Sequence, residues 1–216
     1  MDYYFPSCNF TALFPQASAR VKRYAGSQGM VVAGCCRADH RKPSAEDRVY
    51  YACTNCALIL RETGQAEVHT ILEHIRQDPG FPFPKLEGQT FVIQHCAKAD
   101  DAVKETVCAL ITKMGGNYTE SPETHYCGTN FMKHMTARNL AIAPHTFSAL
   151  EKQVVLLDEA AQEKALAEMI RKYPSGRVVT YCNSCCATLR RHGVQAIHML
   201  ELLFSDYIDG AEKTNG

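Results

Sequence analysis

RVYYACTNCALILRETGQAEVHTIL (residues 48–72) and RVVTYCNSCCATLRRHGVQAIHMLE (residues 177–201) are two copies of one pattern within a single chain. They align without a gap, so that each position of the first copy corresponds to the position 129 residues later. The identical pairs are Arg48/Arg177, Val49/Val178, Cys53/Cys182, Cys56/Cys185, Leu60/Leu189, Arg61/Arg190, Gly64/Gly193 and His69/His198. Chance similarity rarely keeps such a register, so we infer an internal duplication.

Each copy predicts the same series of elements. A β-branched and aromatic run at 49–51 or 178–180 indicates a strand, and Cys-x-x-Cys follows at its end. A helical segment comes next and ends near Gly64 or Gly193. A short strand and a second apolar helix complete the copy. This alternation of strands and helices is typical of an α/β fold with a mostly parallel sheet.

The segments before each copy extend the pattern. A strand leads into Cys8 or Cys96, and helices are predicted around residues 10–24 and 100–114. The Pro- and Gly-rich stretch 76–88 indicates a connection between two units. We therefore predict a first unit at 1–80, a linker at 81–88, and a second unit at 89–216 with a helical insertion at 129–175. Asp158 is the predicted N-cap of a helix in that insertion, which we expect to cover the sheet.

Composition excludes several classes of protein. Lys plus Arg and Asp plus Glu both number 23, so the formal net charge is zero, which argues against nucleic acid or anionic lipid as a partner. The start, MDYYFPSCNF, has an acidic second residue and lacks the basic region of a signal peptide. No stretch approaches the ~20 apolar residues of a membrane span. We expect a cytoplasmic protein without membrane insertion.

Cysteine is unusually abundant. Eleven cysteines cannot all pair within one chain, and in a reducing compartment such clusters more often bind metal or perform redox chemistry. Most of them follow a predicted strand, and the carboxyl ends of parallel strands share one edge of a sheet. The candidate metal ligands are Cys8, Cys35, Cys36, Cys53 and Cys56 in the first unit and Cys96, Cys127, Cys182 and Cys185 in the second. Five thiols exceed a tetrahedral zinc site, which favours iron–sulfur in the first unit, while zinc stays an alternative.

The remaining candidates are interpreted as structural. Cys108 lies inside a helical run and is expected in the core, and Cys186 is a spare thiol beside Cys185. His69 and His198 repeat across the copies, and we expect structural roles for both. His95 precedes Cys96 and is not assigned as a ligand.

The duplicated pattern Cys…Cys-Cys…Cys-x-x-Cys resembles the cysteine-rich CCG domain family. YYFPSC (residues 3–8) looks like the opening of that domain, GCC (34–36) like its middle motif, and VVTYCNSCCATL (178–189) like its closing motif. Members of the family include the B subunit of heterodisulfide reductase and iron–sulfur subunits of glycolate oxidase, glycerol-3-phosphate dehydrogenase and lactate-utilisation complexes. The resemblance spans nearly the whole chain.

This resemblance implies two pseudo-symmetric, Rossmann-like units, each with a [4Fe-4S] cluster. It implies a cluster of the five-ligand, non-cubane type in the first unit, including the adjacent pair Cys35-Cys36. The second unit has Tyr126-Cys127-Gly128 in place of that pair, so its four cysteines suit a cubane cluster, zinc or an incomplete five-ligand site.

The function implied is that of an oxidoreductase subunit passing electrons to a disulfide, a thiol or a related partner system. No Gly-x-Gly-x-x-Gly follows a strand, so no dinucleotide site is evident and electrons must come from outside the chain. The resemblance implies a ferredoxin-like or flavin-carrying subunit as their donor. The alternative is a non-catalytic metal-binding protein stapled by zinc or by one cluster.

Overall fold

The first unit is a parallel sheet of four strands, in the order β2-β1-β3-β4. The computed structural model describes the chain apart from residues 40, 42, 122–133, 172, 174–176 and 206–216. Apolar and aromatic side chains of β1 and β3 are buried, as expected for central strands of a parallel sheet. The elements of this unit are β1 (Asp2–Phe5), α1 (Cys8–Leu13), α2 (Pro15–Ser27), β2 (Val31–Val32), β3 (Arg48–Tyr51), α3 (Thr54–Thr63), β4 (Glu67–Thr70) and α4 (Ile71–Gln77).

The second unit repeats this sheet with the strand order β6-β5-β7-β8, again entirely parallel. In the described part of the chain, helices α6, α7 and α8 lie between its second and third strands, whereas the described residues between β2 and β3 of the first unit form a loop. The elements are β5 (Thr90–Gln94), α5 (Asp101–Lys113), β6 (Asn117–Glu120), α6 (Ala137–Ile142), α7 (Pro144–Glu151), α8 (Glu159–Ile170), β7 (Arg177–Thr180), α9 (Asn183–Arg191), β8 (Ala196–His198) and α10 (Met199–Leu203). The predicted α/β class with two similar, parallel units is confirmed.

Local signals set most of the helix boundaries. Asp100 caps α5 and Asp158 caps α8, each side chain accepting a bond from the amide three residues on. The single helix predicted around residues 10–24 is wrong, because the segment forms α1 and α2 with a break at Phe14. Pro15 restricts the residue before it to non-helical conformations and is itself favoured at the first position of a helix.

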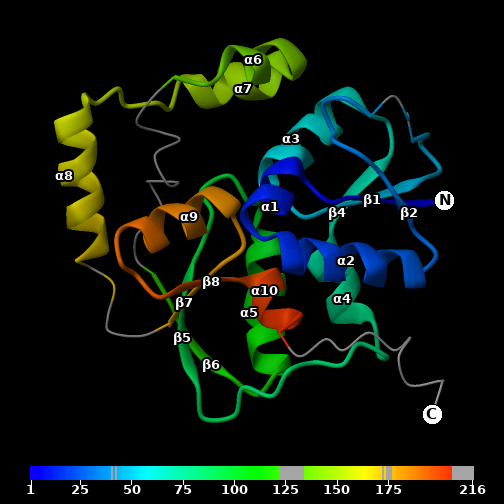
Figure 1. Cartoon of the computed structure of the whole chain (residues 1–216). Coiled ribbons are helices and arrows are strands. Elements are labelled where there is room, and N and C mark those ends of the chain that lie inside the picture. The colour runs from blue at the N-terminus through cyan, green and yellow to red at the C-terminus, as the bar shows by residue number, and fades with distance from the viewer. Residues whose placement is uncertain (40, 42, 122–133, 172, 174–176, 206–216) are drawn as a thin grey trace.

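The two units share one hydrophobic core. Helices α1 and α2 of the first unit pack against α9 and α10 of the second, and α4 packs against α5 (Figure 1). The aromatic ring of Tyr24 on α2 lies 5.7 Å from that of Phe204, just after α10. Phe81, in the connecting segment, lies 5.2 Å from Phe204 and is itself buried. The connection is therefore part of the core, and the boundaries at 80 and 89 stay predictions.

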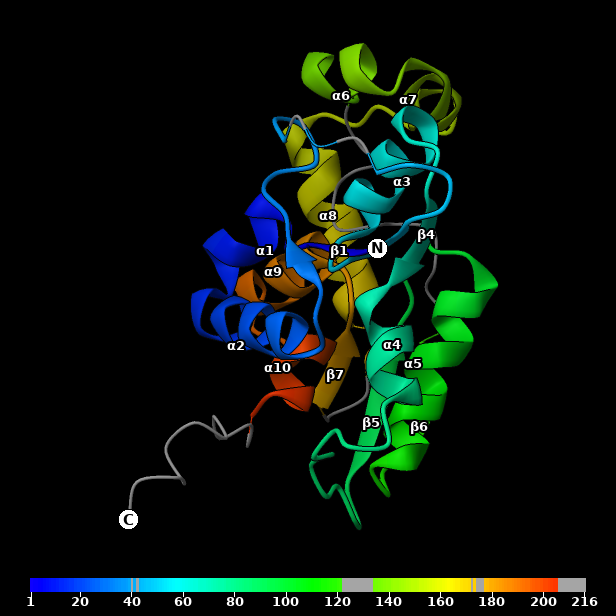
Figure 2. The ribbon, with the colours of Figure 1, turned by 90° about the vertical axis from the view of Figure 1, so that its right-hand side faces the viewer.

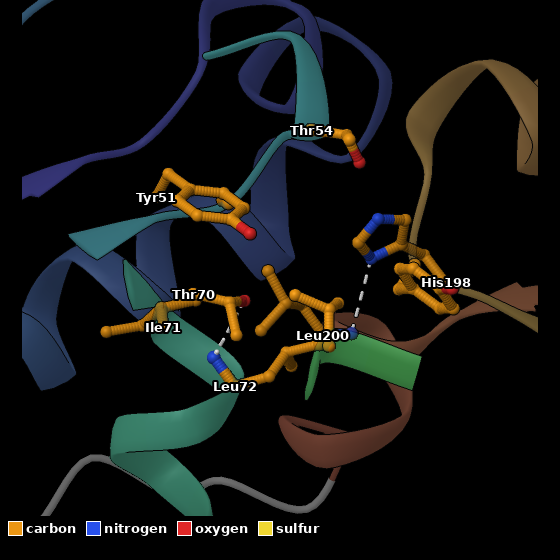
Figure 3. Close-up of a pocket in the computed structure, with 10 residues that line it drawn as sticks. Tyr51, Thr54, Thr70, Ile71, Leu72, His198 and Leu200 are labelled. Atoms are coloured by element: carbon orange, nitrogen blue, oxygen red, sulfur yellow. Dashed lines mark hydrogen bonds between the residues drawn. The ribbon is translucent and has the colours of Figure 1, made fainter. Parts of the chain in front are cut away.

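The equivalent helix starts of the two repeats face one another across this shared core. Figure 3 shows Thr70 accepting a bond from the Leu72 amide at 3.3 Å and His198 accepting one from the Leu200 amide at 3.2 Å. The caps are offset by one residue, because His69, the sequence counterpart of His198, precedes the capping Thr70. The two histidines predicted to be structural thus lie in different places, since His198 is buried whereas His69 lies between Glu67 and Glu73.

The helical segment between β6 and β7 extends beyond its own unit. Helices α6 and α7 lie at the end of the molecule next to α3 of the first unit (Figure 2). The carboxylate of Glu62 on α3 accepts bonds from the amides of His145 and Thr146 at the start of α7, at 2.9 and 2.8 Å. We expected this insertion to cover a sheet, and that expectation did not include the contact between α7 of the insertion and α3 of the first unit. Among the described residues, no helix is both long and apolar enough to cross a membrane.

Candidate metal centre

Cys8 stands where β1 ends and α1 begins. The preceding residue, Ser7, is buried and has φ of 63°, the left-handed region that few non-glycine residues adopt. Such a conformation costs on the order of 1–3 kcal/mol and is typical of functional sites. The Ser7 side chain accepts a hydrogen bond from the Phe10 amide and also approaches the thiol of Cys53. The strained turn thus joins the end of β1 to the cysteine motif of the next strand.

Cys35 and Cys36 lie in the loop that follows β2. The amides of Ala38 and Asp39 both donate to the carbonyl of Cys35, at 2.9 and 2.8 Å, which closes a tight turn. The Asp39 carboxylate in turn accepts a bond from the Gly34 amide at 2.5 Å. The loop is therefore built so that both thiols project from one turn.

The five candidate cysteines of the first unit form a continuous chain of thiols. Cys8 lies close enough to Cys35, and Cys35 to Cys36, for each pair of thiols to influence the other's pKa. Cys36 and Cys56 have their Sγ atoms 3.3 Å apart, and Cys56 is hydrogen-bonded to Cys53. Three strand ends thus bring together thiols that are up to 48 residues apart in the sequence, as Cys8 and Cys56 show.

The electrostatics lower the pKa of two thiols within this chain. The hydrogen bond from Cys56 lowers the pKa of Cys36, with help from the charge of Arg37. The Cys56 thiol, followed by the first amides of α3 and Ser7, likewise lowers the pKa of Cys53. The same bonds to Cys36 and Cys53 raise the pKa of Cys56, so this thiol stays protonated and acts as the hydrogen-bond donor. Burial raises the pKa of Cys35.

A pocket of about 620 Å³ opens over three of these thiols, those of Cys8, Cys53 and Cys56. The second unit supplies one wall, because α6 and the residue before it contribute Thr136, Arg138 and Asn139. The guanidinium of Arg37, beside the cysteine pair, donates to the Asn139 side chain at 2.6 Å. The candidate site of the first unit is therefore completed by the insertion of the second.

In the second unit the structure brings three of the four candidate cysteines near one side chain. Cys96, Cys182 and Cys185 are all buried, and all three lie close enough to Tyr181 to raise its pKa, although burial is the main cause. The Tyr181 hydroxyl accepts a bond from the Cys96 amide at 3.1 Å. The fourth candidate, Cys127, lies outside the described residues.

The two sets of cysteines meet between the units. Cys53, Cys96 and Cys182 line one narrow pocket, together with Asn183 at the start of α9. Asn183 is only 1% exposed, yet its side-chain amide has no hydrogen-bond partner in the described part of the chain. Buried polar groups normally have partners, so an unpaired amide beside thiols is consistent with a group that binds there.

The spacing of the thiols bears on the kind of metal. Thiolates around one zinc ion, with bonds of about 2.3 Å, lie about 3.8 Å apart. Within the described residues no three cysteine sulfurs lie within 4.8 Å of one another. An iron–sulfur cluster separates its thiolates by several metal and sulfide atoms and accommodates an extended set. The first unit fits a polynuclear cluster through the number of its candidate thiols, five, which exceeds the four ligands of a tetrahedral ion.

Two structural predictions about other cysteines have different outcomes. Cys186 is fully buried on α9, consistent with a spare thiol in the core. Cys108 is half-buried, packs against the core and lies close to Tyr118, so it stands at the boundary of the core rather than inside it. Sequence reasoning also missed Ser7 and Asn139, and only the position of Ser7 directly before Cys8 could have signalled its role.

A scan against protein-family models gave no match, and searches of curated proteins and of solved structures gave none. The class of the molecule therefore rests on its own geometry. It is a duplicated, parallel α/β protein whose described candidate ligands, Cys108 and Cys186 not among them, follow the carboxyl ends of its strands.

Proposed function

We propose that this chain is an iron–sulfur redox protein resembling the B subunit of heterodisulfide reductase. The observation that carries the proposal is the continuous chain of five thiols from Cys8 to Cys56. In the proposal these five hold a [4Fe-4S] cluster of non-cubane type. Cys96, Cys127, Cys182 and Cys185 are the proposed ligands of a second cluster.

The residues of the chain suit this role. Cys36 and Cys53 have lowered pKa values and supply thiolates, with the Cys56 hydrogen bond as the largest cause for both. The N-terminus of α3 provides amide donors for sulfur atoms, and such bonds help to set the potential of a cluster. When bound, the cluster would supply one-electron redox chemistry. Ser7 and the Cys35 turn hold the ligands at fixed positions.

The pocket over the thiols indicates what could approach them. It is open to solvent on one side and carries the guanidinium groups of Arg37 and Arg138. A small disulfide or thiol with an acidic group would therefore meet both sulfur and positive charge in one place. We propose the disulfide as the electron acceptor, which two electrons and two protons reduce to two thiols.

The adjacency of the two cysteine sets suits electron transfer between them. Cys53 of the first set and Cys96 and Cys182 of the second line the same narrow pocket. A ferredoxin-like or flavin-carrying partner is the proposed donor, because the sequence carries no dinucleotide fingerprint. We place the activity in the cytoplasm, where reducing conditions preserve free thiols.

One observation favours a second candidate function. Because Cys53, Cys96 and Cys182 come from both units and line one pocket, a metal bound there would staple the units together. A zinc-binding structural protein is therefore the alternative, and the same measurement separates the two.

The test is a count of metal and acid-labile sulfide on protein purified without air. About four iron and four sulfide per occupied unit, with an EPR signal after reduction or oxidation, is the expected result. Cys35→Ser should change that signal, whereas Cys186→Ala, which alters a buried thiol outside the proposed ligand set, should leave it unchanged. Colourless protein with stoichiometric zinc and no sulfide would refute the iron–sulfur proposal and support the structural one.

A further inference from the structure

Three side chains of the second unit converge on one point away from the proposed cluster ligands. His95 directly follows β5, Glu120 ends β6, and Cys108 lies on α5, which packs beside β6 (Figure 1). One ligand atom from each lies within 4.8 Å of the other two, a grouping that no other set of such side chains reaches among the described residues. The set combines nitrogen, sulfur and oxygen donors.

The histidine is already oriented as metal-binding histidines are. Its Nδ1 lies 3.1 Å from the Tyr181 hydroxyl, and its Nε2 lies 3.0 Å from the Glu120 carboxylate. The ring of His95 is buried, so these two contacts fix its direction. A ligating imidazole typically bonds through one nitrogen while the other donates to a neighbouring group. Here Nε2 would bind the ion and Nδ1–H would donate to Tyr181.

The other two donors complete an accessible site. Cys108 is half-buried, and its sulfur is hydrogen-bonded to the Tyr118 hydroxyl, a bond that would persist to a metal-bound thiolate. The side chain of Glu120 is 58% exposed, which leaves a path for an ion to enter from solvent. In tetrahedral zinc sites with bonds of about 2.0–2.3 Å, ligand atoms stand about 3.3–3.8 Å apart. The present spacing needs only about an ångström of side-chain movement.

The donor types select the ion. One imidazole, one thiolate and one carboxylate suit Zn²⁺, which accepts all three and is commonly four-coordinate. An iron–sulfur cluster takes cysteine ligands mainly, and this set offers a single one. Three protein ligands leave the fourth position of a tetrahedron for water or another ligand.

We propose that His95 Nε2, Cys108 Sγ and the Glu120 carboxylate form a mononuclear zinc site with one open coordination position. The site uses none of the nine cysteines assigned to clusters, so the result of testing it does not depend on whether the proposed clusters are present. Binding releases the thiol proton to solvent, while the neutral His95 ring keeps its single proton on Nδ1 and offers Nε2 to the ion.

Cadmium-113 NMR of the full-length protein, kept reduced, tests the proposal with Cd²⁺ as the probe for Zn²⁺. Cadmium bound by one sulfur with nitrogen and oxygen ligands resonates far upfield of cadmium bound by three or four thiolates. The cluster cysteines therefore do not obscure the signal. We expect one such upfield resonance in the wild-type protein, and zinc added in excess should displace it.

Variants assign that resonance to the three side chains. Cys108→Ala should abolish the upfield resonance, and alanine is a good helix former, so α5 should stay folded. Glu120→Gln should weaken cadmium binding at this site by more than about 100-fold, which exceeds the usual effect of losing a residue that only hydrogen-bonds to a ligand. Glu105→Gln, at an exposed position of the same helix α5, is the matched control and should retain it. Absence of the resonance in saturated wild-type protein, or its persistence in Cys108→Ala with unchanged circular dichroism, would overturn the proposal.

Discussion

His198 should make the folding stability of this protein sensitive to acid, and His198→Asn should remove much of that sensitivity. The imidazole is 1% exposed and packs against the rings of Phe10 and Phe14, with centroids 4.9 and 5.1 Å away. Its Nδ1 accepts the Leu200 amide at the start of α10 (Figure 3). A proton on Nδ1 would abolish this bond and place a charge in the shared core.

The magnitude follows from the pKa of the ring. Burial, reinforced by the positive charge of Arg190, lowers the pKa of His198 from about 6.5 to about 3. In this range the unfolded chain binds a proton that the folded chain excludes. The contribution of His198 to stability is therefore present above about pH 6.5 and is lost as the pH falls toward 3. The slope approaches ~1.4 kcal/mol per pH unit, or about 5 kcal/mol over the whole interval.

Urea unfolding of the metal-free protein from pH 7 to pH 4 measures this slope. Asn is a good N-cap and does not titrate, so His198→Asn should flatten the curve even though the smaller side chain lowers stability at pH 7. His145→Asn, at an exposed position on α7, should keep the wild-type slope. Equal slopes in the wild-type protein and in His198→Asn would refute the reasoning.

Three further outcomes follow from contacts of the described residues. Glu62→Ala removes both acceptors at the start of α7 and should raise hydrogen exchange of that helix; unchanged exchange would contradict the assigned contact. Oxidised glutathione added to metal-free protein should form a Cys36–Cys56 disulfide, the two thiols losing two protons and two electrons while the oxidant becomes two reduced thiols. Peptide mass spectrometry detects this bridge, and a bridge at other cysteines instead would argue against the 3.3 Å approach. Phe204→Ala should lower the free energy of unfolding by about 3–5 kcal/mol in one thermal transition, because its ring joins both units; two separate transitions would show independent cores.

The sequence predicted the fold well because the duplicated segments carry strong local signals. Strand runs such as Val178–Thr180 and cap residues such as Asp158 specify elements from their immediate neighbours alone. The aligned Cys-x-x-Cys motifs also specify parallel strands ending at one edge. The gathering of Cys53 and Cys56 with Cys36 follows from that shared edge, so the sequence alone was enough to predict it.

The remaining features depend on contacts between distant segments. The wall that α6 adds to the thiol pocket relies on the Arg37–Asn139 and Glu62–His145 bonds, which no local pattern indicates. Cys108 was expected in the core because it lies inside a helical run, yet its helix α5 packs against the exposed strand β6. His69 and His198 differ in burial and in their contacts because, relative to the aligned histidine, α4 begins one residue later than α10.

The wall supplied by α6 has a consequence for the order of synthesis. All five thiols of the first unit exist once Cys56 has been translated, whereas α6 begins only at Ala137. At about 5–20 residues per second, the interval is on the order of ten seconds. During that time the growing chain presents its cysteines without the second unit's helices above them. Vectorial translation thus leaves these thiols accessible before the chain itself narrows the entrance.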